Sequence, residues 1–224
     1  MSIKDWSENE RPREKLLHQG VNALSDAELL AILLRTGTSG MDAVAMARHL
    51  LKSFGSLRQL LSADLDTIKQ HKGLGVAAYT QFAAVRELGK RLLKEELQQN
   101  PQVSDSESFG EYLRLSIGIE SVEVMLAIFL NQQNQIIKIE ELSRGTVSEH
   151  TVYIREVLKK ALQYNASSII IAHNHPSGST FASEEDRIFT IRLKAALKLI
   201  EIQLLDHFIV TANESISFAQ HNLL

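Results

Sequence analysis

Two histidines, a serine and an aspartate lie close together in the sequence with a spacing that suits a metal site. The sequence reads His173-Asn174-His175-Pro176-Ser177-Gly178, and Ser183 and Asp186 follow. A catalytic zinc takes three protein ligands and keeps one exchangeable position, and imidazole and carboxylate groups both bind it. His173, His175 and Asp186 would supply the three ligands, so the spacing predicts a catalytic zinc site.

The segment before the histidines predicts the strand that would position them. Residues 168–172 (Ser-Ile-Ile-Ile-Ala) are short, β-branched and bounded by turn residues, which is typical of a buried strand. Histidines at positions i and i+2 of a strand project from one face, about 6.6 Å apart along the backbone. A Pro-Ser-Gly turn then ends the strand. Ser183 and Asp186 also fit a helix capping box, which would fix the start of the helix that presents Asp186.

A hydrolase of this kind also needs a general base to take the proton of the attacking water. Glu123 is the first candidate, because it begins the apolar strand 124–130 and can reach a site at the edge of a sheet. The alternatives are Glu120 and, at the end of the next predicted strand, Glu140 and Glu141.

The ligand set favours zinc but also fits iron, manganese or nickel. Metal-bound imidazoles are normally oriented by a second hydrogen bond. Asp206 and His207 are candidates for that role, and a buried structural pair is the alternative. No His-Glu-x-x-His motif is present.

The composition is that of a globular protein without disulfides. Of the 224 residues, 44% are hydrophobic and 23% are charged, which is ordinary for a folded domain. There is no cysteine, which excludes thiolate metal ligands and a zinc deaminase of the cysteine-ligated type. The first residues are polar with no signal-peptide core, and no apolar run is long enough to span a bilayer. We therefore expect a cytoplasmic protein with no membrane partner.

The chain divides into two predicted domains, residues 1–100 and 101–224, at the polar, turn-rich stretch 100–106. Capping residues and apolar periodicity predict helices in the first domain at 24–34, 42–54, 57–61, 64–71 and 76–98. The second domain is predicted to hold helices at 106–117, 153–164 and 183–200 and strands at 123–130, 135–142, 168–175, 202–210 and 215–219. Helices interleaved with apolar strands indicate an α/β or α+β domain with a sheet core.

Gly73 and Gly75 lie in the turn between two predicted helices and resemble the helix-hairpin-helix motif of DNA-binding proteins. Glycines permit a tight turn whose backbone N–H groups, at a helix N-terminus, can contact a phosphate. The alternative is a simple turn between two packed helices. The first hundred residues hold 14 Lys and Arg against 12 Asp and Glu, a weak basic excess. DNA binding through this turn would be nonspecific and sensitive to salt.

The whole pattern resembles a known family. His-x-His, seven residues and then Ser-x-x-Asp is similar to the signature of JAMM (MPN-plus) metallopeptidases. The His-Asn-His-Pro-Ser-Gly motif resembles that of the bacterial RadC (UPF0758) family, and the resemblance covers nearly the whole chain. The flanking segments that support this are Arg144-Gly145-Thr146, Arg155-Glu156 and Leu205-Asp206-His207. Ile154 departs from the proline more often found there, which puts only the local helix entry in doubt.

The resemblance implies a fold, a site and a function. The fold would be an all-helical N-terminal domain with a helix-hairpin-helix-like motif, followed by an MPN/JAMM domain with a central mixed sheet flanked by helices. Zn²⁺ would be bound by His173, His175 and Asp186, with Glu123 as the acid/base and Ser183 near the oxyanion of the tetrahedral intermediate. The function would be that of a zinc-dependent metallopeptidase or isopeptidase acting on an unknown protein or peptide.

Two other functions stay open. One is a nucleic-acid-associated factor in DNA repair or recombination, whose N-terminal domain binds DNA. The other is a scaffold in which the metal only stabilises the fold.

Overall fold

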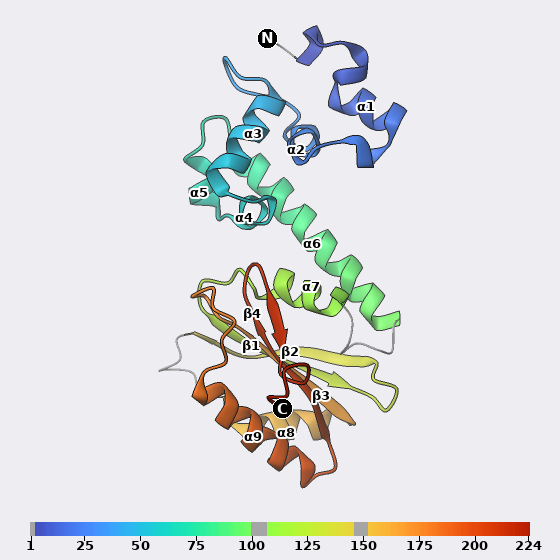
Figure 1. Ribbon diagram of the computed structural model, residues 1–224, viewed down its shortest axis with the longest axis vertical. Helices are drawn as coiled ribbons and strands as arrows, with labels where there is room; N and C mark the ends of the chain where they lie inside the picture. Colours follow the sequence, from blue (N-terminus) through green and yellow to red (C-terminus); the bar gives the residue numbers. More distant parts are fainter. Residues whose placement is uncertain (1–2, 100–106, 146–151) are drawn as a thin grey trace. The chain divides into compact units, whose positions relative to one another are not determined.

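The computed structural model describes residues 3–99, 107–145 and 152–224 (Figure 1). The chain forms two compact units, Met1–Leu88 and Gly89–Leu224. The predicted domain boundary at 100–106 lies outside the described residues, as does Thr146.

The first unit is helical, as predicted. Its elements are η1 (Ile3–Asp5), η2 (Glu8–Glu10), α1 (Pro12–Gln19), η3 (Val21–Ala23), α2 (Asp26–Leu34), α3 (Ala43–Phe54), α4 (Leu57–Ser62), α5 (Leu65–Lys69) and the first part of α6 (Val76–Gln99). Side-chain caps begin four of these helices, because each accepts an otherwise unpaired backbone N–H of the first turn. The capping residues are Ser25, Asp42, Ser56 and Asp64.

The second unit is built on one mixed sheet. Its elements are α7 (Glu107–Ser116), β1 (Glu123–Leu130), β2 (Ile136–Gly145), α8 (Ile154–Gln163), β3 (Ser168–Asn174), α9 (Glu184–Lys198), β4 (Gln203–Val210) and β5 (Ser215–Ser217). The strand order is β2-β1-β3-β4-β5, in which β3 and β4 are parallel and the other pairs are antiparallel. A helical region followed by a mixed sheet with helices is the predicted fold class.

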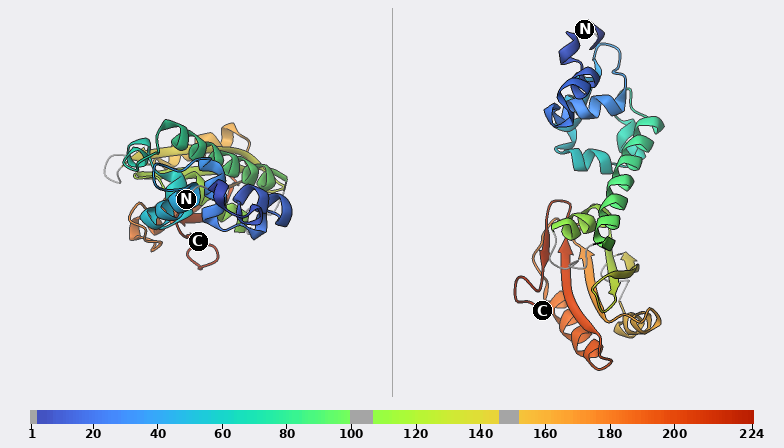
Figure 2. Two further views of the ribbon diagram at one scale, coloured as in Figure 1. Left: turned by 90° about the horizontal axis from the view of Figure 1, so that it is seen from above. Right: turned by 90° about the vertical axis from the view of Figure 1, so that its right-hand side faces the viewer.

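Helices cover both faces of this sheet, which explains why β3 is apolar along its length. Ile170 and Ala172 lie in a core cluster with α7, whereas Ile169 and Ile171 lie in a cluster with α8 and α9 (Figures 1 and 2). Because alternate side chains of a strand point to opposite faces, His173 continues the second series and faces α9.

The structure differs from the sequence expectations in several elements. The η1–α1 region, including the helix Pro12–Gln19, was not predicted in detail. Strand β2 continues to Gly145 instead of ending at 142, because Glu123 at the start of β1 pairs with Gly145. Strand β5 ends at Ser217 instead of 219. Helix α8 begins at Ile154, so isoleucine stands at the helix entry without disrupting it.

No helix in the described part of the chain is both long and apolar enough to cross a membrane.

Candidate metal centre

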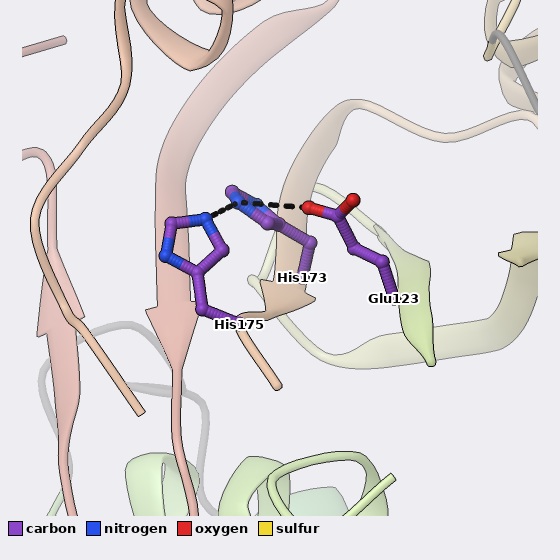
Figure 3. A group of neighbouring side chains, drawn as sticks. All are labelled: Glu123, His173 and His175. Atoms are coloured by element: carbon purple, nitrogen blue, oxygen red, sulfur yellow. Dashed lines mark hydrogen bonds and ion pairs between the residues drawn. The ribbon is translucent and has the colours of Figure 1, made fainter. Parts of the chain in front are cut away.

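The four residues expected to bind metal or act as base come together where β1 starts, β3 ends and α9 begins. Figure 3 shows the side chains of Glu123, His173 and His175 converging, the first from the start of β1 and the others from the end of β3. Their ligand atoms all lie within 4.8 Å of one another, so this group could hold a metal ion. Asp186, in the first turn of α9, lies with one carboxylate oxygen 3.1 Å from Nε2 of His173 and the other 3.6 Å from Nε2 of His175.

Strand register is what brings Glu123 to the histidines. Met125 of β1 pairs with His173 of β3 in antiparallel register. Glu123 lies two residues before Met125 on β1, on the same face, and His175 follows directly after the end of β3. The side chains of Glu123, His173 and His175 therefore meet at this end of the strand pair. The sheet therefore joins residues that lie fifty positions apart in the sequence.

The separations between the three predicted ligands suit a tetrahedral ion. The Nε2 atoms of His173 and His175 are 3.0 Å apart, and the two distances to Asp186 are 3.1 and 3.6 Å. Zinc–ligand bonds of about 2.0–2.1 Å in tetrahedral geometry place neighbouring ligand atoms about 3.3 Å apart. The separations of His173 from His175 and from Oδ1 of Asp186 are close to this value, whereas the 3.6 Å distance to His175 is measured from Oδ2, the other carboxylate oxygen.

When its ring is neutral, His175 presents an unprotonated nitrogen to this site. Its Nδ1 lies 2.8 Å from the backbone carbonyl oxygen of Ser179. A carbonyl oxygen only accepts, so Nδ1 carries the hydrogen and donates it. In the neutral ring Nε2 is then a lone pair, which is the form that binds a metal.

Helix α9 presents Asp186 through the capping box that the sequence predicted. The backbone N–H and the hydroxyl of Ser183 both donate to Oδ2 of Asp186, at 2.9 and 2.7 Å, and the N–H of Asp186 donates to the Ser183 hydroxyl at 3.1 Å. Ser183 therefore orients Asp186. A contact between Ser183 and an oxyanion stays a prediction, because in this arrangement the hydroxyl hydrogen points to Asp186.

The electrostatics of the site favour a bound cation. Burial by itself raises the pKa of Asp186, but hydrogen bonding with His173, His175 and Ser183 lowers it overall, well below its usual range. The Asp186 carboxylate in turn raises the pKa of His175, against the opposing effect of burial. An ionised carboxylate beside two imidazole nitrogens favours positive charge at this place, either as a proton on an imidazole or as a metal ion.

The structure separates Glu123 from the three alternative bases. The carboxylate of Glu123 lies 4.0 Å from Nε2 of His173. Glu120 and Glu141 both bind the guanidinium of Arg144, and Glu140 binds Lys160 and the hydroxyl of Tyr164. Among these four glutamates, Glu123 is therefore the one that adjoins the histidines.

Three polar residues around the site had no assigned role from sequence, or an undecided one. Asn174 is fully buried and binds the backbone on both sides of Glu123. His207 lies 2.8 Å from His173, and Thr190 lies 2.6 Å from His207. Asp206 belongs to another cluster, in which it accepts from the backbone of His207 and Ala219. Two sequence signals were available for these residues. Asn174 lies between the two histidines of the His-Asn-His motif, and His207 lies in a neighbouring predicted strand.

The two glycines predicted to contact phosphate lie in the first unit. Gly73 has φ +87° and packs closely against Thr38. A Cβ added at position 73 would lie 1.9 Å from Cγ2 of Thr38. Gly75 has open space around it. Close packing therefore accounts for a glycine at position 73, and phosphate contact by either glycine stays a prediction.

Comparisons with known proteins agree with the architecture. A family described as "RadC-like JAB domain" matches residues 103–223, and one described as "UPF0758 N-terminal" matches residues 3–80. A UPF0758 protein of Neisseria meningitidis serogroup C is 58% identical over 224 residues, covering 100% of both chains. UPF0758 proteins of Chromobacterium violaceum and Nitrosomonas eutropha are 51% and 48% identical over the same full length.

Proposed function

The chain belongs to the RadC (UPF0758) family with a RadC-like JAB domain, and from this premise we propose that it is a zinc-dependent hydrolase of amide or isopeptide bonds. The observation that carries the proposal is the geometry of the three residues: the Nε2 atoms of His173 and His175 lie 3.0 Å apart, and an oxygen of Asp186 lies 3.1 Å from the first and the other oxygen 3.6 Å from the second. Glu123 beside them supplies the basic group that such a hydrolase needs.

The metal ligands and Glu123 have separate roles in the proposed reaction. His173, His175 and Asp186 hold the ion, and zinc in such a site acts as a Lewis acid and makes a water molecule acidic near neutral pH. Glu123 is 4.0 Å from Nε2 of His173, too far for a direct hydrogen bond, and its carboxylate adjoins the place where the attacking water would lie.

Glu123 takes the proton from the attacking water and later gives it to the departing amine. Ser183 keeps Asp186 in place and can approach an oxyanion once its hydroxyl turns away from Asp186.

Metal content and cleavage by matched variants test this proposal. The zinc-loaded protein and its Glu123→Gln variant would each be incubated with a proteome-derived peptide and protein mixture, and new amino groups would be identified by mass spectrometry. We expect Glu123→Gln to keep its zinc and to lose activity by about 10²–10⁴-fold. Glu141→Gln is the control, since Glu141 is paired with Arg144, and it should cleave like the unaltered protein.

Two results would contradict the proposal. One is the absence of bound zinc after dialysis against zinc-containing buffer. The other is undiminished cleavage by metal-replete Glu123→Gln protein.

A further inference from the structure

A closed ring of contacts joins two of the proposed metal ligands, Asp186 and His173, through His207 and Thr190. Starting from Asp186, its carboxylate oxygen lies 3.1 Å from Nε2 of His173, and Nδ1 of His173 lies 2.8 Å from Nε2 of His207. Nδ1 of His207 lies 2.6 Å from the hydroxyl of Thr190, which lies 2.6 Å from the backbone carbonyl of Asp186. The ring links β3, β4 and α9, the three elements whose relative positions fix the histidine–carboxylate geometry.

The hydrogens in this ring can be placed from one end. The carbonyl oxygen of Asp186 only accepts, so the hydroxyl of Thr190 must donate to it. A threonine hydroxyl has one hydrogen, and this bond to the carbonyl oxygen takes it. The contact between Thr190 and Nδ1 of His207 therefore needs a hydrogen on that nitrogen. The opposite assignment would leave two acceptor oxygens facing each other at 2.6 Å.

The position of the hydrogen on the His207 ring determines which nitrogen of His173 carries a hydrogen. The His207 ring is completely buried and stacks 4.6 Å from that of Phe218, a setting that disfavours a charged imidazole, so we take the ring as neutral. With a hydrogen on Nδ1, its Nε2 is an acceptor. Nδ1 of His173 must then donate to His207, so that in the neutral His173 ring Nε2 is the lone pair that would bind a metal between Asp186 and His175.

The structure thus assigns Thr190 and His207 as positioning residues that set the metal-binding tautomer of His173 and hold the start of α9 against β3. Neither residue contacts the space between the ligands. This assignment rests on the proposed metal site, and it adds that a buried threonine hydroxyl, one helical turn beyond Asp186, controls metal affinity.

Zinc affinity of the full chain, measured by competition with a chromophoric chelator, tests the assignment. Loss of such an outer hydrogen bond typically weakens metal binding 10–100-fold. Thr190→Val keeps the shape of the side chain and removes the hydroxyl, so we expect a loss in that range. Thr190→Ser restores the hydroxyl and should bind zinc within about threefold of the unaltered protein.

Thr211→Val is the matched control, because Thr211 is a buried threonine whose hydroxyl serves the turn after β4. It should leave zinc affinity unchanged. Equal affinity in Thr190→Val and the unaltered protein would overturn the assignment. No zinc binding by the unaltered protein would instead refute the metal site itself.

Ring-labelled histidine NMR on the unaltered, zinc-loaded protein gives an independent readout that needs no variant to fold. We expect the His173 ring to carry its hydrogen on Nδ1, and the His207 ring to be neutral with its hydrogen on Nδ1. A hydrogen on Nε2 of either ring would overturn the assignment.

Discussion

Asn174 is the residue that joins the two strands on which the site depends. Its Oδ1 accepts from the N–H of Val124 at 2.7 Å, and its Nδ2 donates to the carbonyl oxygens of Val122 and Glu120 at 3.0 and 3.2 Å. These three backbone groups flank Glu123. A side chain between the two histidines thus fixes the backbone that presents the predicted base.

Replacing Asn174 by Asp should destabilise the second unit. The carboxylate would still accept from Val124, but its second oxygen would face two carbonyl oxygens with no hydrogen to share. Leaving such groups unsatisfied in a buried position costs about 1–3 kcal/mol each, so we expect a loss of about 2–4 kcal/mol in unfolding free energy. Urea unfolding followed by far-ultraviolet circular dichroism measures it.

Asn213→Asp is the control for this substitution, because Asn213 is exposed in the same unit. It should change the unfolding free energy by less than about 0.5 kcal/mol. Equal stability of the Asn174→Asp and unaltered proteins would mean that the buried amide does not hold the two strands together.

The site residues differ in how far sequence could predict them. His173, His175, Ser183 and Asp186 lie within one local strand–turn–helix segment, where spacing and periodicity carry the information. Glu123 needed either the family resemblance or the strand pairing. The hydrogen-bond ring through His207 and Thr190 depends on side chains of three elements meeting in the interior, and no local pattern specifies such a meeting.

At the scale of single elements, the start of α2 is stabilised by a charge that acid would remove. Glu28 accepts from the N–H and hydroxyl of Ser25 and forms an ion pair with Lys15 at 2.9 Å. Burial alone raises the pKa of Glu28, but the hydrogen bonds from Lys15 and Ser25 lower it overall to about 2.

The first unit should therefore lose stability in acid. A carboxyl whose pKa is lower in the folded state stabilises above its unfolded pKa, and this contribution disappears as the pH falls from about 4.5 to about 2. Glu28→Gln keeps the capping oxygen but removes the charge, so we expect it to cost about 1–2 kcal/mol at pH 7 and little near pH 2.

Tryptophan fluorescence is the measurement, because Trp6, the single tryptophan of the chain, packs against the core of this unit. Urea unfolding of both proteins at several pH values gives the stability difference. A difference that stayed constant from pH 7 to pH 2 would show that the ionised carboxylate is not responsible. The exposed Glu8→Gln variant should follow the unaltered protein throughout.

The turn between α5 and α6 gives a second prediction at this scale. At Gly73 any side chain meets both a left-handed backbone (φ +87°) and the methyl group of Thr38. We expect Gly73→Ala to lower the free energy of unfolding of the first unit by about 2–3 kcal/mol. Adding Thr38→Ser removes the methyl group and should recover part of this loss, but not the cost of the backbone.

Gly75→Ala is the matched control at the same turn. Gly75 has no positive φ and open space around it, so alanine should be tolerated. The tryptophan-monitored unfolding used for Glu28 measures all three variants. Equal effects at the two glycines would contradict the packing explanation for position 73.

The elements that sequence predicted well are those with local signals. Caps at Ser25, Asp42 and Asp64 place three helix starts, and the apolar run of β1 gives its bounds without error. Helix α1 has no periodic apolar face in its sequence PREKLLHQ, and its remaining local signals, Pro12 at the first position and Gly20 after the end, were missed. The end of β2 is polar, and its strand conformation depends on pairing with β1, which only the assembled sheet provides.

At the scale of the whole molecule, the metal site lies entirely within the second of two compact units. Every residue that we place in or behind it belongs to Gly89–Leu224. The first unit has its own core, which includes Leu30, Val44 and Phe82. Metal binding should therefore affect the stability of one unit and leave that of the other unchanged.

Metal removal tests this separation. A ligand that binds only the folded state at 100 times its Kd adds about 2.7 kcal/mol, which corresponds to roughly 5–10 °C in Tm for a domain of this size. Chelation should lower the thermal stability of the second unit by that amount. Hydrogen exchange read by mass spectrometry should then show faster exchange in β3 and the start of α9, with no change in α2 and α3.

The same experiment separates catalysis from a purely structural role for the metal. Asp186→Ala protein, with or without zinc, should behave like the chelated protein in exchange, because the third ligand is gone. Glu123→Gln should keep the protection that zinc gives and lose only cleavage, because Glu123 acts on the water and not on the fold. If the chelated protein still cleaved while chelation cost several degrees, the metal would be structural. If α2 and α3 lost protection together with β3 on chelation, the two units would not be energetically independent.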